Sequence, residues 1–350
     1  MFRLGQFNPQ QKLLFHTQRI NQWLDGEDVY PILIEFDLSN VCNHKCSFCN
    51  SAYMKDHSAI LDHEVACKTI DDLGKCGIKA INWTGGGEPM LNRAFPSIAV
   101  CAKRNNIEQG LFTNGVKMYE SWKPLIVAQM NWVRISLDAG TKETYLKIKG
   151  ADDFDQAISI AKELVELKNR FAFITKADIG IGFVITPENY KEIPLFSGLI
   201  KQTGVDYGQY KPSTEDGMFD IRLWREEIKP LLETVFADNP KAVINLYKFN
   251  DIITSKLDQE YGKCYGHQFC PCIGADGEVW ACSQKRGIEG FSFGNIHENS
   301  FQDIWASEKR QEVINRINLS DCPKLCKNNE INKALYHIRH PERSLHYNFL

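Results

Sequence analysis

Three cysteines within eight residues constrain this chain more than any other feature. Cys42, Cys46 and Cys49 directly follow a run at 31–38 that is typical of a buried strand. One short loop with three thiolates can hold an iron–sulfur cluster and leave one iron without a protein ligand. The alternative is a zinc site with His44 or a distant cysteine as the fourth ligand, although zinc ligands usually come as Cys-x2-Cys pairs. We therefore expect an iron–sulfur cluster with an open iron at this loop.

The segment from 31 to 213 alternates short apolar runs with longer amphipathic stretches. Strand and helix repeated about six times predict a parallel sheet covered by helices. Six units are fewer than the eight of a closed barrel, so we expect an α/β fold with a partial (βα)6 TIM-like barrel. The expected strands are 31–38, 79–83, 109–113, 132–137, 178–185 and 205–210, and the expected helices are 62–76, 94–105, 122–129, 154–169 and 187–203.

The alternation stops after Pro212, and two helical patterns follow at 221–236 and 243–257. Six cysteines then fall between Cys264 and Cys326, which predicts a C-terminal cysteine-rich domain. We expect the aromatic C-terminal tail to pack back onto the barrel. The division that we expect is an N-terminal extension at 1–30, the barrel at 31–213, a helical connector at 214–258, the cysteine-rich domain at 259–330 and a tail at 331–350.

Charge and cysteine usage exclude several classes of protein. The chain has 41 Lys+Arg and 44 Asp+Glu, a net charge of -3, which argues against a nucleic-acid or membrane partner. The start lacks a signal-peptide pattern, and no stretch approaches the ~20 apolar residues of a membrane span. We expect a cytoplasmic protein, where clustered cysteines indicate metal rather than disulfides. The scattered Cys67, Cys76 and Cys101 are expected to be small buried hydrophobic residues.

Polar and glycine-rich turns follow several of the expected strands. In parallel α/β folds ligands bind at the carboxyl ends of the strands, so these turns should meet the cysteine loop at one mouth. A glycine run or a polar turn is, taken alone, a weak signal, because such turns also simply end strands. The residues concerned are Gly86, Gly87 and Glu88 after the second strand, Asn114 after the third, and Ser136 and Asp138 after the fourth.

The cysteine triplet resembles the Cys-x3-Cys-x-aromatic-Cys hallmark of the radical S-adenosylmethionine (radical SAM) superfamily, with Phe48 as the aromatic residue. The resemblance implies a [4Fe-4S] cluster that binds S-adenosylmethionine and cleaves it to a 5'-deoxyadenosyl radical, which removes hydrogen from a substrate carbon. It implies catalytic cluster ligands at Cys42, Cys46 and Cys49, and cofactor contacts at Phe48, Gly86, Gly87, Glu88, Asn114, Ser136 and Asp138.

The second cysteine group contains Cys264, then Gly277 after twelve residues, and Cys282 four residues later. Asp276 and Gly277 predict a hairpin turn between flanking apolar residues. With the closing Cys322 and Cys326, this stretch resembles the SPASM/Twitch extension of radical SAM enzymes. The resemblance implies an auxiliary [4Fe-4S] cluster, whose ligands we expect to be Cys264, Cys282, Cys322 and Cys326.

Two cysteines of this segment, Cys270 and Cys272, are then surplus. They would replace one of the four ligands, bind nothing, or act as a thiol near the substrate. The resembling family's full form has seven cysteines for two auxiliary clusters, whereas this segment has six. A zinc ribbon built from the same cysteines is the alternative.

We expect a radical SAM oxidoreductase that oxidises a small polar metabolite such as a sugar, an aminocyclitol or a nucleoside. We prefer a small metabolite to a peptide because the thirty residues before the first strand are too short for a separate peptide-recognition domain. One alternative is peptide or protein modification by cross-linking or epimerisation. Another is a structural or electron-transfer protein with iron–sulfur or zinc. The resemblance implies a flavodoxin- or ferredoxin-type reductant as partner.

Overall fold

A single ten-stranded sheet organises the computed structural model, which describes residues 8–173, 175–213, 220–244, 252, 259–323, 325–342 and 346. The strand order is β10-β9-β8-β1-β2-β3-β4-β5-β6-β7. The strands are β1 Leu33–Asp37, β2 Ala80–Thr84, β3 Glu108–Thr113, β4 Trp132–Ser136, β5 Asp178–Ile185, β6 Tyr207–Pro212, β7 Ala242–Ile244, β8 Cys272–Ile273, β9 Glu278–Trp280 and β10 Ser292–Asn295.

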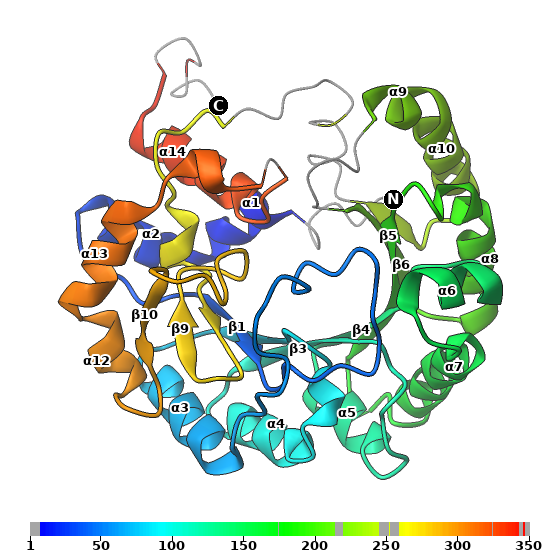
Figure 1. The fold of residues 1–350 in the computed structure, drawn as a ribbon, viewed down its shortest axis with the longest axis horizontal. Helices are drawn as coiled ribbons and strands as arrows, with labels where there is room; N and C mark the ends of the chain where they lie inside the picture. The colour runs from blue at the N-terminus through cyan, green and yellow to red at the C-terminus, as the bar shows by residue number, and fades with distance from the viewer. Residues whose placement is uncertain are drawn as a thin grey trace.

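The strands from β1 to β7 are all parallel to their neighbours, and helices connect them. Figure 1 shows the sheet curving with these helices on its outer face. The α/β fold with a partial, TIM-like barrel is therefore confirmed, and all six expected strands are present to within two residues at each end. The helices are α3 His63–Lys75, α4 Phe95–Arg104, α5 Lys123–Gln129, α6 Lys142–Lys149, α7 Phe154–Arg170, α8 Ile193–Thr203 and α10 Lys229–Asp238.

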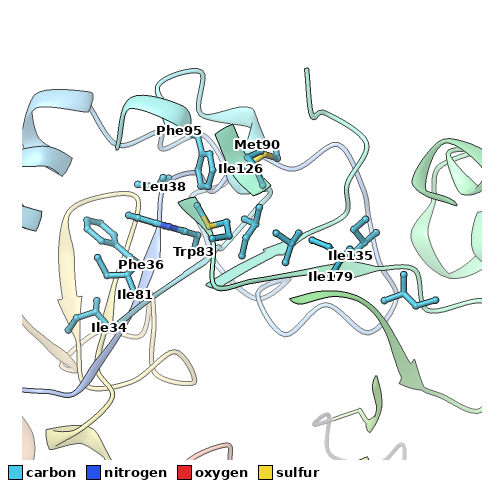
Figure 2. Packing of buried hydrophobic residues seen from close by; sticks show 14 of the residues in the cluster. Ile34, Phe36, Leu38, Ile81, Trp83, Met90, Phe95, Ile126, Ile135 and Ile179 are labelled. Carbon is cyan, nitrogen blue, oxygen red and sulfur yellow. The ribbon is translucent and has the colours of Figure 1, made fainter. Parts of the chain in front are cut away.

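The main core lies between the sheet and the outer helices. Because side chains alternate along a strand, Ile34 and Phe36 of β1 face this core while Glu35 and Asp37 face the other side. The Phe36 ring and the Trp83 ring of β2 have centroids 5.6 Å apart, and Figure 2 labels both side chains in this core. Burying a large apolar side chain of this kind contributes roughly 1.5–3 kcal/mol, so the outer face drives folding and the inner face is left for polar groups.

The expectation that the alternation ends at Pro212 is wrong. A further helical stretch follows, formed by α9 Ile221–Leu223, the π-helical η5 Trp224–Ile228 and α10, and the chain then returns as β7. Gly208 of β6 pairs with Ala242 of β7 in parallel register. The start of the expected helix 243–257 is therefore strand, while 245–251 and 253–258 lie outside the described residues. A three-residue strand is too short to show a strand period in the sequence.

The cysteine-rich segment continues the barrel sheet. Strand β8 pairs with β1 in parallel, with Cys272 opposite Glu35, and β9 and β10 follow as antiparallel neighbours. The hairpin that Asp276 and Gly277 predicted is confirmed, and Gly277 has a φ of +82°, which favours glycine. Helices α12 Phe301–Trp305 and α13 Glu308–Arg316 come next.

The two ends of the described chain form a second, smaller core. Trp23 of α2 (Thr17–Leu24) lies edge-on to Tyr265 and Phe269, at centroid distances of 5.2 and 6.0 Å. Arg339, at the end of α14 (Asn329–Arg339), lies 4.3 Å over the Trp23 ring. The described start of the tail thus packs on the N-terminal helices and not on the barrel, while 343–345 and 347–350 lie outside the described residues. The remaining short elements are α1 Pro9–Leu13, η2 Leu14–His16, η3 Pro89–Leu91, η4 Tyr190–Glu192, η6 Gly266–Gln268 and η7 Leu319–Asp321.

Two of the scattered cysteines depart from expectation. Cys67 on α3 and Cys101 on α4 form a disulfide across the outer helices, with Cα atoms 5.7 Å apart. Cys76 is buried, as expected. Across the described residues, no helix combines the length and the apolar character that a membrane crossing requires.

Candidate functional site

The cysteine loop leaves the carboxyl end of β1 and rests on the end of α6. The backbone N–H of Lys45 donates to the Lys149 carbonyl and that of Ser47 to the Ile148 carbonyl, both at 2.8 Å. The loop is thereby held at two points between Cys42 and Cys49. Helix α6 was absent from our expected elements although Thr141 caps its start and the left-handed Gly150 ends it, which is a readable pair of signals.

Gly86 and Gly87 pack directly against the segment that leads into the cysteines. A Cβ added to Gly87 would lie 2.2 Å from the Val41 carbonyl oxygen, and one added to Gly86 would lie 2.3 Å from Oδ1 of Asn40. The Glu88 N–H donates to the Val41 carbonyl at 2.8 Å. We expected glycine here so that the backbone could approach a ligand. The structure adds a second reason, since the chain itself approaches these positions.

Glu88 is buried and joins the ends of two neighbouring strands. Its carboxylate accepts hydrogen bonds from the Asn114 backbone N–H at 2.7 Å, the Thr113 hydroxyl at 2.5 Å and the Met90 N–H at 3.1 Å. Burial raises the pKa of this carboxyl above its ordinary value. The Asn114 side chain donates to Oδ1 of Asn43 at 2.8 Å, inside the cysteine loop. A contact between Glu88 and a bound ammonium group stays a prediction.

Asp138 has no exposed surface and sits in a left-handed backbone conformation, with a φ of +60°. Its carboxylate accepts from the Ser136 hydroxyl at 2.6 Å and from the Val184 N–H at 2.7 Å, and pairs with Lys149. Burial works against ionisation, but the Lys149 ammonium lowers the pKa of Asp138 below its usual range. The two residues that we expected to contact a cofactor, Ser136 and Asp138, are thus bonded to each other, and a cofactor contact there stays a prediction.

Lys149 is the functional candidate that the sequence reasoning missed. Its side chain is 2% exposed, and its ammonium lies 5.3 Å from the Phe48 ring centroid. Burial alone would lower the pKa of Lys149, but Asp138 and the Cys46 sulfur hold it above its ordinary value. The charged ammonium group of Lys149 is therefore buried next to the cysteine loop. Phe48 itself is half-buried against the main core.

The spacing of the possible ligands argues against the zinc alternative for the first loop. Nε2 of His44 lies 3.1 Å from the Asp153 carboxylate, which leaves Nδ1 of His44 buried and without a hydrogen-bond partner among the described residues. Zinc–sulfur bonds of about 2.3 Å would place ligand sulfurs roughly 3.8 Å apart. Within the described residues, the set of three or more possible ligand atoms that lie within 4.8 Å of one another is His63, Cys67 and Cys101, which includes neither cysteine group and whose two sulfurs are joined in the disulfide. Both groups are spaced more widely than zinc requires, as a bulkier cluster would need.

The second cysteine group gathers from three loops, with Cys322 and Cys326 in the same one, between η7 and α14. Cys264 precedes η6, Cys282 follows β9, Cys322 follows η7 and Cys326 precedes α14. Burial, with Cys326 beside it, raises the pKa of Cys264 to about 11, and burial with Cys326 and Cys264 raises the pKa of Cys282. The four predicted ligands are therefore electrostatic neighbours. Thiols with raised pKa values become thiolates only when a cation binds them, which fits a metal cluster at this position.

The surplus cysteines are buried and lie on the inner side of β1. Sγ of Cys272 is 3.9 Å from the Asp37 carboxylate, while Cys270 lies in the electrostatic range of Lys327 and Cys326. Among the described residues, neither sulfur lies within 4.8 Å of two of the four predicted ligand sulfurs that are equally close to each other, as a zinc site would require.

A buried ionic chain connects the two cysteine groups. Arg286 pairs with Asp37 and donates to the Ser51 hydroxyl at 2.7 Å, two residues beyond Cys49. Lys327, next to Cys326, pairs with Glu35 of the same strand β1. No local pattern in the sequence predicts these contacts, because each joins a residue of β1 to one in the distant cysteine-rich segment.

Comparison with known proteins agrees with this arrangement. The radical SAM superfamily model matches residues 37–193, and the iron–sulfur cluster-binding SPASM domain model matches residues 264–328. A tungsten-containing aldehyde ferredoxin oxidoreductase cofactor-modifying protein of Pyrococcus furiosus is 23% identical over 291 residues, which are 78% of this chain and 80% of that protein. The mycofactocin maturase MftC of Mycolicibacterium smegmatis is 25% identical over 294 residues, 82% of this chain and 72% of that protein.

Solved structures share the fold. The crystal structure of SuiB from Streptococcus suis bound to the precursor peptide SuiA matches with a TM-score of 0.66 at 15% identity, over 85% of this chain and 70% of that one. The structure of anSMEcpe with bound S-adenosylmethionine and the Kp18Cys peptide matches with a TM-score of 0.61 at 20% identity, over 87% and 88% of the two chains.

Proposed function

The chain belongs to the radical SAM superfamily and carries a SPASM domain, and we propose that this enzyme modifies a peptide or protein substrate. Its family cofactors are [4Fe-4S] clusters and S-adenosylmethionine. When bound, they supply the 5'-deoxyadenosyl radical that removes hydrogen from a substrate carbon. The two non-enzymatic alternatives, a zinc protein and an electron-transfer protein, do not account for a matched radical SAM domain.

The proposed cluster ligands are the two cysteine groups. Cys42, Cys46 and Cys49 would hold the cluster that binds S-adenosylmethionine, because three soft sulfurs in one loop leave one iron open. Four ligands suffice for a closed cluster, and Cys264, Cys282, Cys322 and Cys326 would hold the auxiliary one. The wide spacing of both groups supports this assignment over zinc.

The remaining site residues position these ligands. The Asp138–Lys149 pair fixes the end of α6, and the last two carbonyls of α6 hold the amides of Lys45 and Ser47. Burial raises the pKa of Cys46, and the nearby positive charge of Lys149 works against that rise. Glu88 fixes the strand ends opposite the loop through Thr113 and Asn114. Direct contacts of Glu88, Ser136 and Asp138 with S-adenosylmethionine belong to the same proposal.

The observation that carries the peptide substrate is the resemblance over both domains to proteins of that kind. One relative is named a maturase, and two structures of this fold contain peptides. This alternative fits better than the small-metabolite oxidation that we expected.

A second candidate is a small cofactor as substrate, which the name of the Pyrococcus furiosus relative favours. To separate the two, the anaerobically reconstituted enzyme is supplied with S-adenosylmethionine and dithionite, and formation of 5'-deoxyadenosine is measured. Peptide libraries are compared with nucleosides, aminocyclitols and sugars. We expect stimulation by peptides together with a mass or stereochemical change in the peptide, and no stimulation in the Cys46→Ala variant. Stimulation by a small metabolite and by no peptide would overturn the proposal.

A further inference from the structure

Three side chains on the outer helices converge outside the candidate site. His63 and Cys67 lie about one turn apart on α3, and Cys101 lies on α4, which Figure 1 shows beside it. Their possible ligand atoms, an imidazole nitrogen and two sulfurs, all lie within 4.8 Å of one another. Nε2 of His63 is 3.6 Å from Sγ of Cys67. Two sulfurs and one imidazole are a donor set typical of zinc.

The two sulfurs are joined in the disulfide, and in that form they cannot bind a metal as thiolates. Reduction by a dithiol breaks the sulfur–sulfur bond. Two electrons and two protons convert the pair to two thiols, and the dithiol is oxidised to its own disulfide. Cys67 is half-buried, so a small dithiol can reach its sulfur from solvent, and accessible disulfides are the labile ones. The pair can therefore exist in a reduced form.

The packing of the two helices keeps the three donors together after reduction. Ile70 and Leu73 of α3 and Ile98 and Ala102 of α4 are buried in the main core, so the disulfide is not what holds the helices in place. Zinc bonds of about 2.3 Å to sulfur and about 2.0–2.1 Å to nitrogen place tetrahedral ligand atoms roughly 3.6–3.8 Å apart. The imidazole nitrogen already has this distance to one sulfur. The two sulfurs reach it by side-chain rotation once their bond is broken.

The surroundings of the three donors favour a bound metal ion. The Arg104 guanidinium donates to Sγ of Cys101 at 3.4 Å, and a neighbouring positive charge favours thiolate over thiol. Cys101 is buried whereas His63 is exposed, so an ion can enter from solvent on the imidazole side. Among the residues that the structure describes, the set holds three donors. A water molecule would complete the tetrahedron, as in zinc sites with three protein ligands.

We propose that the reduced chain binds one zinc ion through His63, Cys67 and Cys101. Each thiol gives up its proton to water on binding, and two thiolates and the neutral imidazole coordinate the ion. The disulfide and the zinc ion exclude each other, so α3 and α4 are cross-linked by one in the oxidised chain and by the other in the reduced chain. This inference goes beyond the proposed function and does not depend on it, because the three side chains lie on the outer helices.

The test compares two redox states of the anaerobically reconstituted holoenzyme, in which the proposed cluster ligands are occupied. One sample is treated with dithiothreitol and the other with oxidised glutathione, and alkylation followed by peptide mass spectrometry verifies the state of Cys67 and Cys101. Both samples are desalted, incubated with zinc chloride and desalted again. We expect about one more zinc per chain in the reduced sample, and zinc should suppress alkylation of both cysteines. Equal zinc content in the two states, or full alkylation in the presence of zinc, would overturn the proposal.

Substitutions locate the ion. Cys67→Ser is expected to lose the additional zinc, and His63→Gln to bind it at least tenfold more weakly. His63 is exposed, so His63→Gln keeps the fold and decides the outcome if Cys67→Ser does not fold. Cys76→Ser is the matched control, since Cys76 is a buried cysteine at the end of the same helix and outside the ligand set. Loss of zinc in Cys76→Ser, or unchanged zinc affinity in His63→Gln, would overturn the proposal, whether or not a peptide is modified.

Discussion

The Asp138 carboxylate and the Lys149 ammonium form an ion pair from which water is excluded, with side chains 0% and 2% exposed. Asp138 follows β4, while Lys149 is the last residue of α6. The pair therefore links a strand end to the helix end on which the cysteine loop rests. Removing one partner of such a pair leaves a buried charge without compensation.

Replacing Lys149 by Met is expected to lower the free energy of unfolding by about 3–5 kcal/mol, because the Asp138 charge stays buried. Adding Asp138→Asn should recover much of this loss. The matched control is Lys142→Met on the same helix, since Lys142 is 51% exposed in its pair with Asp152 and its loss should cost less than about 1 kcal/mol. Thermal unfolding of the reconstituted variants measures these differences. Equal losses in Lys149→Met and Lys142→Met would refute the role of the buried pair.

Gly87→Ala is expected to displace the segment before the cysteines, because the new Cβ would lie 2.2 Å from the Val41 carbonyl oxygen, which is backbone and cannot rotate away. Iron analysis should show loss of about four irons per chain, with the auxiliary cluster retained. Gly198→Ala is the control. Gly198 lies within α8 with nothing within 4 Å of an added Cβ, so alanine there should stabilise the helix by roughly 0.5–1 kcal/mol. Full iron content in Gly87→Ala would show that the loop tolerates the displacement.

Single substitutions should sort the six C-terminal cysteines by role. Ser in place of Cys264, Cys282, Cys322 or Cys326 is expected to lower iron from about eight to about four per chain, since each removes one of four ligands. Cys270→Ser and Cys272→Ser should keep about eight irons, and they are the controls because both cysteines lie in the same segment and are more buried than the four proposed ligands. Iron and acid-labile sulfide assays with visible absorbance decide it. Loss of four irons in Cys270→Ser would show that Cys270 is a ligand.

The barrel could be predicted from the sequence because its strands and helices are long and periodic. β5, with eight residues, was expected at its observed bounds, and α3 begins where Asp62 caps it. β7 could not be predicted, since three residues carry no period and its only support is pairing with β6.

In the candidate site too, local features could be predicted from the sequence and long-range contacts could not. Cysteine spacing is local and could be read directly, whereas the role of Lys149 depends on packing with Asp138 across eleven residues and on burial. The contacts of Arg286 with Asp37 and of Lys327 with Glu35 span more than 240 residues, and no local pattern reports them. Nor could the pairing of Cys67 with Cys101 be read, because it follows from the packing of α3 on α4.

The stability of the folded chain is expected to depend on pH through Asp276. Burial and the neighbouring Glu278 and Asp56 raise the pKa of Asp276, so the folded chain keeps this proton at a pH where the unfolded chain loses it. The contribution of Asp276 to the free energy of unfolding is therefore fully present below the ~3.9 of an ordinary aspartate and is lost as the pH rises through the raised pKa. Asp276→Asn keeps the oxygen that accepts from the Glu278 N–H at 3.1 Å, so the hairpin turn is preserved while the charge is gone. This variant should show a flatter dependence of stability on pH in that window, measured by thermal unfolding at several pH values. A profile in Asp276→Asn as steep as that of the unaltered enzyme would assign the dependence to another carboxylate.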